Sequence, residues 1–299
     1  MTIRILQFGT TGQVARELLG QAKDHDVEIV ALSRAEADLE DPEVVAAAVR
    51  AHPADLVIVA AAYTAVDLAE SEPGKAHEIN AESPAAIARA CAARGSAMVW
   101  FSTDYVFDGE KGAPYVEDDA TGPANIYGAS KLSGERMVLA ACPRALVIRT
   151  SWVVSSHGKN FVKTMLRLAG EGGQIRVVDD QFGRPTSAAD LAGFVLGQAA
   201  RLANAPAGDP AFGIHHFANA GEVTWKEFAE GVFDLALGPD APTVAAIATA
   251  ERPSPARRPM RGTLDTHKLE RVFGVTPRPW REALADIVRE LKLEQRSAA

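Results

Sequence analysis

Short apolar runs alternate with helical patterns through the first half of the chain. The residues 56–61 form a nearly continuous apolar run, which is typical of a strand covered on both faces. Alternation of this kind predicts a parallel sheet wound with helices on both sides. The expected strands are Ile3–Phe8, Glu28–Leu32, Leu56–Ala61, Ala97–Phe101 and Ala145–Arg149. The expected helices are Gly12–Ala22, Pro42–Ala51, one or two within Pro73–Arg94 with an interruption near Pro84, and Asn125–Ala141.

After about Thr150 this rhythm loosens. We expect helices at Phe161–Ala169, Asp190–Ala203, Thr224–Leu237 and Trp280–Leu293, and a short strand at Ile175–Val178. Thr224 with Glu227 three residues later forms a capping-box pattern, and the three prolines of Pro253–Pro259 predict an irregular surface loop. The predicted fold class is α/β, with a Rossmann-type doubly wound parallel sheet. Residues 1–150 would be the dinucleotide-binding domain, and 151–299 mainly a smaller substrate-binding α/β region that returns some segments to the first domain.

Composition and charge narrow the class of protein. The 299 residues carry a net charge of −8 and no strongly basic stretch, which argues against a nucleic-acid partner. The N-terminus lacks a signal-peptide pattern, and the longest apolar run, Leu56–Tyr63, is far shorter than the roughly 20 residues of a membrane span. Together these features predict a cytoplasmic protein without membrane contact. Cys91 and Cys142 are expected to be buried reduced thiols, and no Cys/His cluster has zinc-ligand spacing.

A glycine-rich turn follows the first expected strand and opens the first helix. Gly9 would permit the tight turn, Gly12 would let the backbone approach a pyrophosphate, and Ala15 would allow close packing of helix on strand. The alternative is a plain structural turn, but the position between strand and helix favours dinucleotide binding. The second strand ends in Ser33-Arg34 rather than in an acid. Since Arg34 can pair with a 2′-phosphate, we expect NADPH as the cofactor. Asp38 could serve as the acid on the adenine side, so use of NADH stays an alternative.

Tyr127 and Lys131 are four residues apart in an expected helix and therefore lie on the same face. A phenol titrates near 10 and is inert at neutral pH unless a neighbouring cation stabilises the phenolate. Thr103 follows the fourth strand and could polarise a carbonyl group, since ligands of open α/β sheets bind at the carboxyl ends of strands. We expect Tyr127 to donate a proton and Lys131 to lower its pKa and bind the nicotinamide ribose. A solvated helix face is the alternative, which the convergence of three segments on one crevice disfavours.

Several longer motifs resemble one known family. They are Phe8–Gln13, Ala60–Asp67 with Ala69–Pro73, Ser102–Phe107, Asn125–Lys131 with Gly134-Glu135, Arg149–Val153, Asn160-Phe161 and Asp180–Thr186. The glycine and Tyr/Lys motifs resemble the extended short-chain dehydrogenase/reductase family as a whole. The others resemble its dTDP-4-dehydrorhamnose reductase branch, along almost the whole chain.

This resemblance implies reduction of the C4 ketone of dTDP-4-dehydro-L-rhamnose to dTDP-L-rhamnose by NAD(P)H, a step that supplies surface polysaccharide. By position it implies cofactor contacts from Gly12, Gln13, Val14, Ser33, Asp38, Leu39, Ala62, Tyr63 and Thr64, with Tyr127 and Lys131. Thr103, Asp104 and Trp152 would face the sugar, since a flat indole can stack on it. Arg184 is a candidate partner for the pyrophosphate.

Two departures from the family pattern leave questions open. Ser33 replaces the usual acid after the second strand, which puts a preference for NADH in doubt. Some relatives form dimers around Mg²⁺ held by carboxylates; Glu17 and Glu282 match two of those positions, but Ala189 stands at the third with Asp190 beside it. We therefore predict no metal, and leave Mg²⁺ and a homodimer open.

Other functions remain possible on the same scaffold. One is a different nucleotide-sugar reductase, or an epimerase or dehydratase that retains its cofactor. Another is a non-catalytic regulatory subunit that binds a nucleotide. Such a subunit would tolerate loss of Tyr127 or Lys131, and both are present here.

Overall fold

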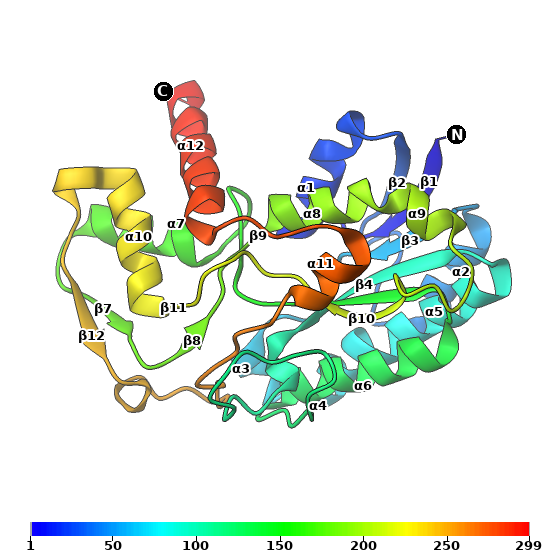
Figure 1. Cartoon of the computed structure of the whole chain (residues 1–299), viewed down its shortest axis with the longest axis horizontal. Coiled ribbons are helices and arrows are strands. Elements are labelled where there is room, and N and C mark those ends of the chain that lie inside the picture. The colour runs from blue at the N-terminus through cyan, green and yellow to red at the C-terminus, as the bar shows by residue number, and fades with distance from the viewer. Residues whose placement is uncertain (1, 299) are drawn as a thin grey trace.

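A six-stranded parallel sheet forms the centre of the larger lobe (Figure 1). The structure, a computed structural model, describes residues 2–298 and the side chains of residues 2–293. In sheet order the strands are β10 (Gly213–His216), β5 (Ala145–Thr150), β4 (Ala97–Thr103), β3 (Leu56–Val59), β1 (Ile3–Phe8) and β2 (Val27–Leu32). Every neighbouring pair is parallel, which confirms the expected Rossmann-type α/β class.

Helices cover both faces of this sheet because its strands are apolar on both sides. Val57 and Val59 point into one buried cluster, whereas Leu56 and Ile58 point into the other. One layer contains α2 (Pro42–Ala51), α5 (Ser83–Arg94) and α6 (Ile126–Ala141). The other contains α1 (Gln13–Gln21), α8 (Ala188–Gly197) and α9 (Ala199–Asn204). Segments beyond residue 150 thus complete the sheet, as β10, and its second helix layer.

A smaller lobe has its own apolar core (Figure 1). It is built from α7 (Phe161–Glu171), α10 (Trp225–Leu237) and α12 (Trp280–Ala298). Three small sheets accompany them: β7 (Ile175–Val178) parallel to β12 (Val244–Ile247), β8 (Phe182–Gly183) antiparallel to β11 (Val223–Thr224), and β6 (Val153–Val154) parallel to β9 (Thr186–Ser187). The predicted capping box of Thr224 and Glu227 opens α10.

Several boundaries differ from the sequence-based expectation. The helical region of residues 73–94 consists of α4 (Pro73–His77), a π-helical turn (Glu78–Glu82) and α5. The expected interruption near Pro84 is therefore found as this π-helical turn, and Pro84 lies in the first turn of α5. The expected helix at residues 190–203 is divided between α8 and α9. β4 runs two residues further than expected, so Thr103 is its last residue. The sequence did not predict α3 (Val66–Ala69), α11 (His267–Phe273) or β12.

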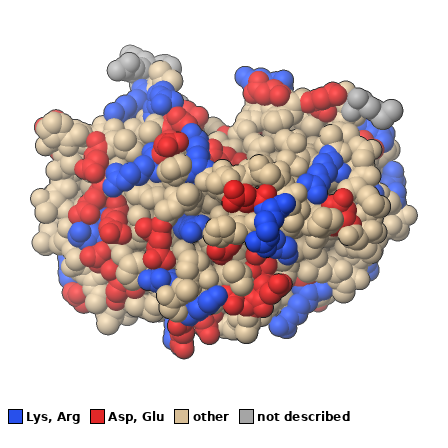
Figure 2. Space-filling model, in the orientation of Figure 1, with Lys and Arg blue, Asp and Glu red and all other residues tan. Residues whose placement is uncertain are grey.

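The surface is polar and of mixed charge. Lys and Arg are interspersed with Asp and Glu over the face drawn in Figure 2. Within the described residues, no helix combines the length and apolar character needed to cross a membrane.

Candidate active site

A cavity of about 460 Å³ opens at the carboxyl ends of the sheet strands. Its walls come from the glycine-rich turn, the residues after β3, the end of β4, α6 and the segment 150–159. It brings together many of the predicted site residues, namely Gly9, Gly12, Gln13, Val14, Ala62, Thr64, Tyr127 and Lys131.

The glycine-rich turn is built for close approach of the backbone. Gly9 has φ +97°, and a Cβ there would lie 3.0 Å from the Cβ of Ala61. Only glycine adopts this conformation in that space without strain. Gly12 is the N-cap residue of α1 and supplies no side-chain cap, so the first N–H groups of the helix are open to an anion.

Gln13 connects this turn to the segment that forms the opposite wall. Its Nε2 donates to the carbonyl of Val153 at 3.0 Å, and its Oε1 accepts from Ser155 Oγ at 3.1 Å and from Asn160 Nδ2 at 2.9 Å. The same segment contributes Lys159, a cation on the cavity wall that the sequence analysis did not single out. Its position becomes apparent only when residues 153–160 are folded over α1.

Tyr127 is half-buried, and its hydroxyl lies near enough to that of Thr103 for the two to interact. Burial raises the pKa of Tyr127 to about 12, although the interaction with Thr103 acts in the opposite direction. The phenol is therefore protonated at neutral pH.

Lys131 is buried beneath the cavity. Its Nζ donates to the carbonyl of Phe101 at 2.6 Å and lies 4.1 Å from the centre of the Trp100 ring. Burial lowers the pKa of Lys131 to about 7, while Glu135 opposes that shift. Burial of the phenol is the largest influence on the Tyr127 pKa, and the Lys131 ammonium is held by the Phe101 carbonyl of β4, so the expected lowering of that pKa by Lys131 stays a prediction.

A buried ion pair lies below these two residues. One edge of the Arg149 guanidinium binds both oxygens of Glu135, through Nε at 2.8 Å and Nη2 at 2.7 Å. Ser102 Oγ donates to the same carboxylate at 2.6 Å, which joins β4 to α6. Glu135 and Arg149 are almost completely buried, so this pair is part of the support of the active site.

Asp104 is buried directly after Thr103. Its Oδ1 accepts from Thr103 Oγ1 at 3.0 Å, and burial raises the pKa of Asp104 to about 7. The backbone at Gly262 packs so closely on the carboxyl group that a Cβ there would collide with Oδ2.

The residues expected to contact the substrate further from the ketone lie outside this cavity. Trp152 has φ +47°, which is rare for a large residue, and its indole stacks on Trp225 with ring centres 3.6 Å apart. Arg184 is partly buried, burial lowers its pKa, and Asp265 and Glu222 oppose that shift.

A second cavity of about 620 Å³ lies against the smaller lobe. Arg257 and Arg258 line it, and both belong to the proline-rich segment predicted as an irregular loop. Arg252, just before that segment, and Trp225 line it as well. Arg258 Nη2 donates to Asp67 at 3.0 Å, which ties this segment to the larger lobe. Three arginines within seven residues could have been interpreted as a small anion site.

The residues expected near the adenosine ribose surround the end of β2. The Gly9 N–H donates to the carbonyl of Leu32 at 2.9 Å, so this loop adjoins the glycine-rich turn. Arg34 binds Asp38 at 3.0 Å and also pairs with Glu40. The side chains of three further predicted cofactor residues have partners within the protein. Ser33 donates to Glu36, Leu39 packs in the core, and the Tyr63 hydroxyl donates to Glu72.

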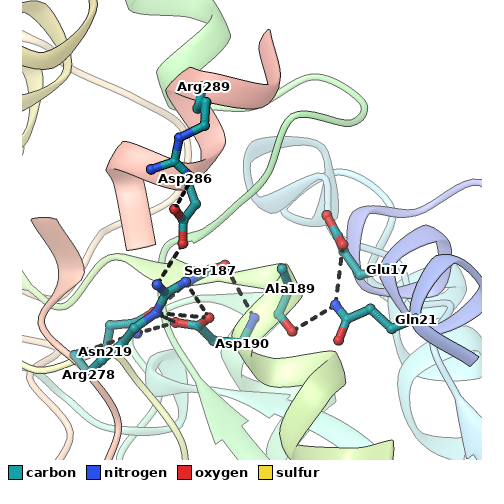
Figure 3. A network of polar contacts seen from close by, with 9 residues as sticks. All are labelled: Glu17, Gln21, Ser187, Ala189, Asp190, Asn219, Arg278, Asp286 and Arg289. Atoms are coloured by element: carbon teal, nitrogen blue, oxygen red, sulfur yellow. Dashed lines mark hydrogen bonds and ion pairs between the residues drawn. The ribbon is translucent and has the colours of Figure 1, made fainter. Parts of the chain in front are cut away.

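Figure 3 shows the surroundings of Glu17 and Ala189, two of the three positions matched to a magnesium site. Asp190, beside Ala189, is bound by Arg278 through Nε at 2.9 Å and Nη2 at 2.7 Å, and Arg278 also binds Asp286 at 2.6 Å. Burial is the main cause that raises the pKa of Glu17. The carboxylates that also raise it are Glu290 and Asp190 rather than the expected Glu282. No group of three ligating side chains suited to a metal occurs in the described part of the chain. Within one chain, a guanidinium thus already binds Asp190, the carboxylate beside the third expected position.

Comparison with known proteins places this arrangement in a family. The family model described as "RmlD substrate binding domain" matches residues 3–293. A dTDP-4-dehydrorhamnose reductase of Sinorhizobium fredii is 44% identical over 299 residues, covering 99% of this chain and 100% of the relative. That of Escherichia coli is 41% identical and covers 97% of this chain and 98% of the relative.

Solved structures agree with these relatives. The dTDP-4-dehydrorhamnose reductase of Bacillus anthracis in complex with NADP has a TM-score of 0.89 and 33% identity, covering 97% of this chain and 100% of that one. The one from Clostridium acetobutylicum has a TM-score of 0.90 and 36% identity with the same coverage. A dTDP-glucose 4,6-dehydratase of Streptomyces venezuelae, 20% identical over 99% of this chain and 98% of its own, shares the fold with a TM-score of 0.77. By sequence and by structure, this chain belongs to the dTDP-4-dehydrorhamnose reductase family.

Proposed function

We propose that this protein reduces the C4 ketone of dTDP-4-dehydro-L-rhamnose to dTDP-L-rhamnose with NADPH, in the supply of surface polysaccharide. The observation that carries this proposal is the meeting of three separate segments at one cavity. An uncapped helix N-terminus, the Tyr127 hydroxyl with the neighbouring Thr103, and the buried Lys131 are all found there. Each supplies a different requirement of ketone reduction: phosphate binding, proton donation and orientation of the cofactor.

NADPH, when bound, supplies a hydride to the carbonyl carbon. The residues of the chain bind the carbonyl oxygen and protonate it. Tyr127 donates its proton to that oxygen, which its raised pKa allows because the phenol is fully protonated at neutral pH. Thr103 holds the Tyr127 hydroxyl beside that oxygen. Lys131 binds the nicotinamide ribose and, when charged, favours the phenolate left behind. Trp152 faces the sugar, and the buried Asp104 supports Thr103.

Residues further along the cavity would hold the two nucleotides. The N-terminus of α1, with Gly9, Gly12, Gln13 and Val14, receives the cofactor pyrophosphate, and Lys159 adds a cation there. Ser33 and Arg34 receive the 2′-phosphate, with Asp38, Leu39, Ala62, Tyr63 and Thr64 around the adenosine and nicotinamide ends. Positive charge for the substrate diphosphate comes from the arginines of the second cavity, Arg252, Arg257 and Arg258. Arg184, which does not line that cavity, adds to it. The 620 Å³ cavity falls within the usual range of small-molecule sites, about 300–1,000 Å³.

The two lobes would bind different ligands. Residues 1–150 bind chiefly the cofactor and 151–299 chiefly the nucleotide sugar, with β10, α8 and α9 returning to the first lobe. The acidic net charge of −8 supports a cytoplasmic enzyme without a nucleic-acid partner. A homodimer would not need a metal, because Arg278 neutralises Asp190 within one chain.

The decisive test mixes the purified chain with NADPH and dTDP-4-dehydro-L-rhamnose. We expect the NADPH absorbance to fall in proportion to the sugar added, and the product to be dTDP-L-rhamnose by NMR. A sugar conversion without net consumption of NADPH would indicate an epimerase or dehydratase instead. Cofactor binding without any turnover would indicate a regulatory subunit.

A further inference from the structure

Asp104 is a buried acid whose burial the proposed function does not explain. Its side chain is 3% exposed, and Oδ2 has no hydrogen-bond partner among the described residues. Gly262 closes the space on that side, since any Cβ there would collide with Oδ2. A carboxylate in such a place pays a large desolvation cost, whereas a carboxylic acid does not. The geometry therefore favours a group that holds a proton.

Thr103 connects this acid to the phenol of Tyr127. A threonine hydroxyl has one proton to donate and two lone pairs. Thr103 Oγ1 accepts from the Tyr105 N–H at 3.2 Å, lies 3.0 Å from Asp104 Oδ1, and interacts with the Tyr127 hydroxyl. The three side chains thus lie in the order Tyr127, Thr103, Asp104, in which one chain of hydrogen bonds can connect them.

The direction of this chain depends on the proton at Asp104. With a carboxylate, Thr103 donates to Asp104, and Tyr127 must donate to Thr103. With a carboxylic acid, Asp104 donates to Thr103, and Thr103 donates to the Tyr127 oxygen. In the second direction the Tyr127 proton is free to point into the cavity, toward the substrate oxygen.

We propose that Asp104 is a positioning residue that aims the Tyr127 proton at the substrate and then restores it through Thr103. This inference rests on the proposed reductase function. The electrons arrive with the hydride, so these residues move only a proton. Tyr127 gives its proton to the new alkoxide, Thr103 passes its hydroxyl proton to the phenolate, and Asp104 replaces the Thr103 proton. The Asp104 carboxylate regains a proton from water after product release.

The surroundings of Asp104 suit this role. Burial raises the pKa of Asp104 to about 7, so both protonation states are accessible near neutrality. The titratable groups that interact with it are the phenols of Tyr105, in its own segment, and Tyr127, from α6. Arg258, from the loop of the smaller lobe, is hydrogen-bonded to Tyr105 and not to Asp104.

The test compares the pH dependence of kcat/KM in the wild type and in Asp104→Asn. The wild-type value should fall as the pH rises through about 7 because Asp104 loses its proton, and Lys131 loses its proton in the same range. The limiting slope is then about two, and Asp104→Asn should reduce it to about one while lowering kcat about ten-fold or more. Tyr105→Phe, which removes a neighbouring phenol outside the hydrogen-bonded chain, should keep the wild-type slope.

Other outcomes separate the possible failures. If Asp104→Asn raises only KM and keeps the slope, the acid merely binds the sugar and the inference is wrong. If that variant does not fold, Thr103→Val breaks the same chain and must also reduce the slope to about one. An infrared difference spectrum without substrate should show a protonated carboxylic acid in the wild type at a pH of about 6, and its absence would also overturn the inference. A wild type that never oxidises NADPH would instead remove the proposed function itself.

Discussion

Breaking the buried Arg149–Glu135 pair should destabilise the protein far more than breaking a surface pair. Arg149→Met removes two bonds to Glu135, at 2.8 and 2.7 Å, and one to the Glu117 carbonyl at 3.2 Å. Both partners have side chains only 2% exposed, so the remaining carboxylate cannot be hydrated. Removal of one partner of a buried pair costs about 3–5 kcal/mol. We expect a loss of that size in the free energy of unfolding.

Thermal and urea unfolding would measure this loss. At about 2–4 °C per kcal/mol for a domain of this size, the melting temperature should fall by about 6–20 °C. The control is Arg167→Met, which breaks a pair with Glu171 in which both side chains are more than half exposed. A surface pair of this kind contributes about 0–1 kcal/mol.

A double variant tests the reasoning behind the number. Glu135→Leu combined with Arg149→Met removes both charges, and should recover most of the stability lost by Arg149→Met alone. It should not recover all of it, because Ser102 Oγ loses the acceptor that it binds at 2.6 Å. If Arg149→Met costs less than about 1 kcal/mol, or if the double variant is worse than either single one, Glu135 is not a buried charge held by Arg149.

Three further outcomes are expected. Tyr127→Phe should lose about 10²–10⁴-fold in kcat while binding NADPH normally by fluorescence, and near wild-type turnover would refute Tyr127 as the proton donor. Arg34→Ala should raise KM for NADPH about ten-fold or more but leave KM for NADH unchanged, with the exposed Arg136→Ala as control; an equal effect on both cofactors would place Arg34 away from the 2′-phosphate. Extensive dialysis against EDTA should change neither turnover nor melting temperature, because Arg278 already binds Asp190; a loss restored by Mg²⁺ would contradict this.

The sheet could be predicted because its information is local. Each strand of the first half is an apolar run between turn residues, and residues 42–51 and 175–178 have the predicted bounds as α2 and β7. The short pieces of the smaller lobe could not be predicted in this way. β12, for example, is four residues long and exists through its pairing with β7, in which Val244 pairs with Ile175, 69 residues earlier. Such a strand is specified by tertiary contacts rather than by its own pattern.

The cavity was predictable in part for the same reason. Gly9, Gly12, Tyr127 and Lys131 belong to recognisable local motifs, and the parallel topology places their elements at one edge of the sheet. Lys159 and the three arginines of residues 252–258 carry no such motif. They become cavity residues because Gln13 fixes the segment 153–160 and Asp67 fixes Arg258, and neither contact has a counterpart in local sequence.

The charge states of the site were least accessible to sequence analysis. Spacing put Lys131 near Tyr127, but it could not show that the ammonium is held by the Phe101 carbonyl and that burial dominates both pKa values. Two buried carboxylates then behave differently. Glu135 is bound on both oxygens by Arg149, whereas Asp104 has one unpartnered oxygen and a pKa of about 7. Two carboxyl groups in different environments can therefore serve different roles in one site. Glu135 holds Arg149 below Lys131, and Asp104 is the acid next to Thr103 and Tyr127.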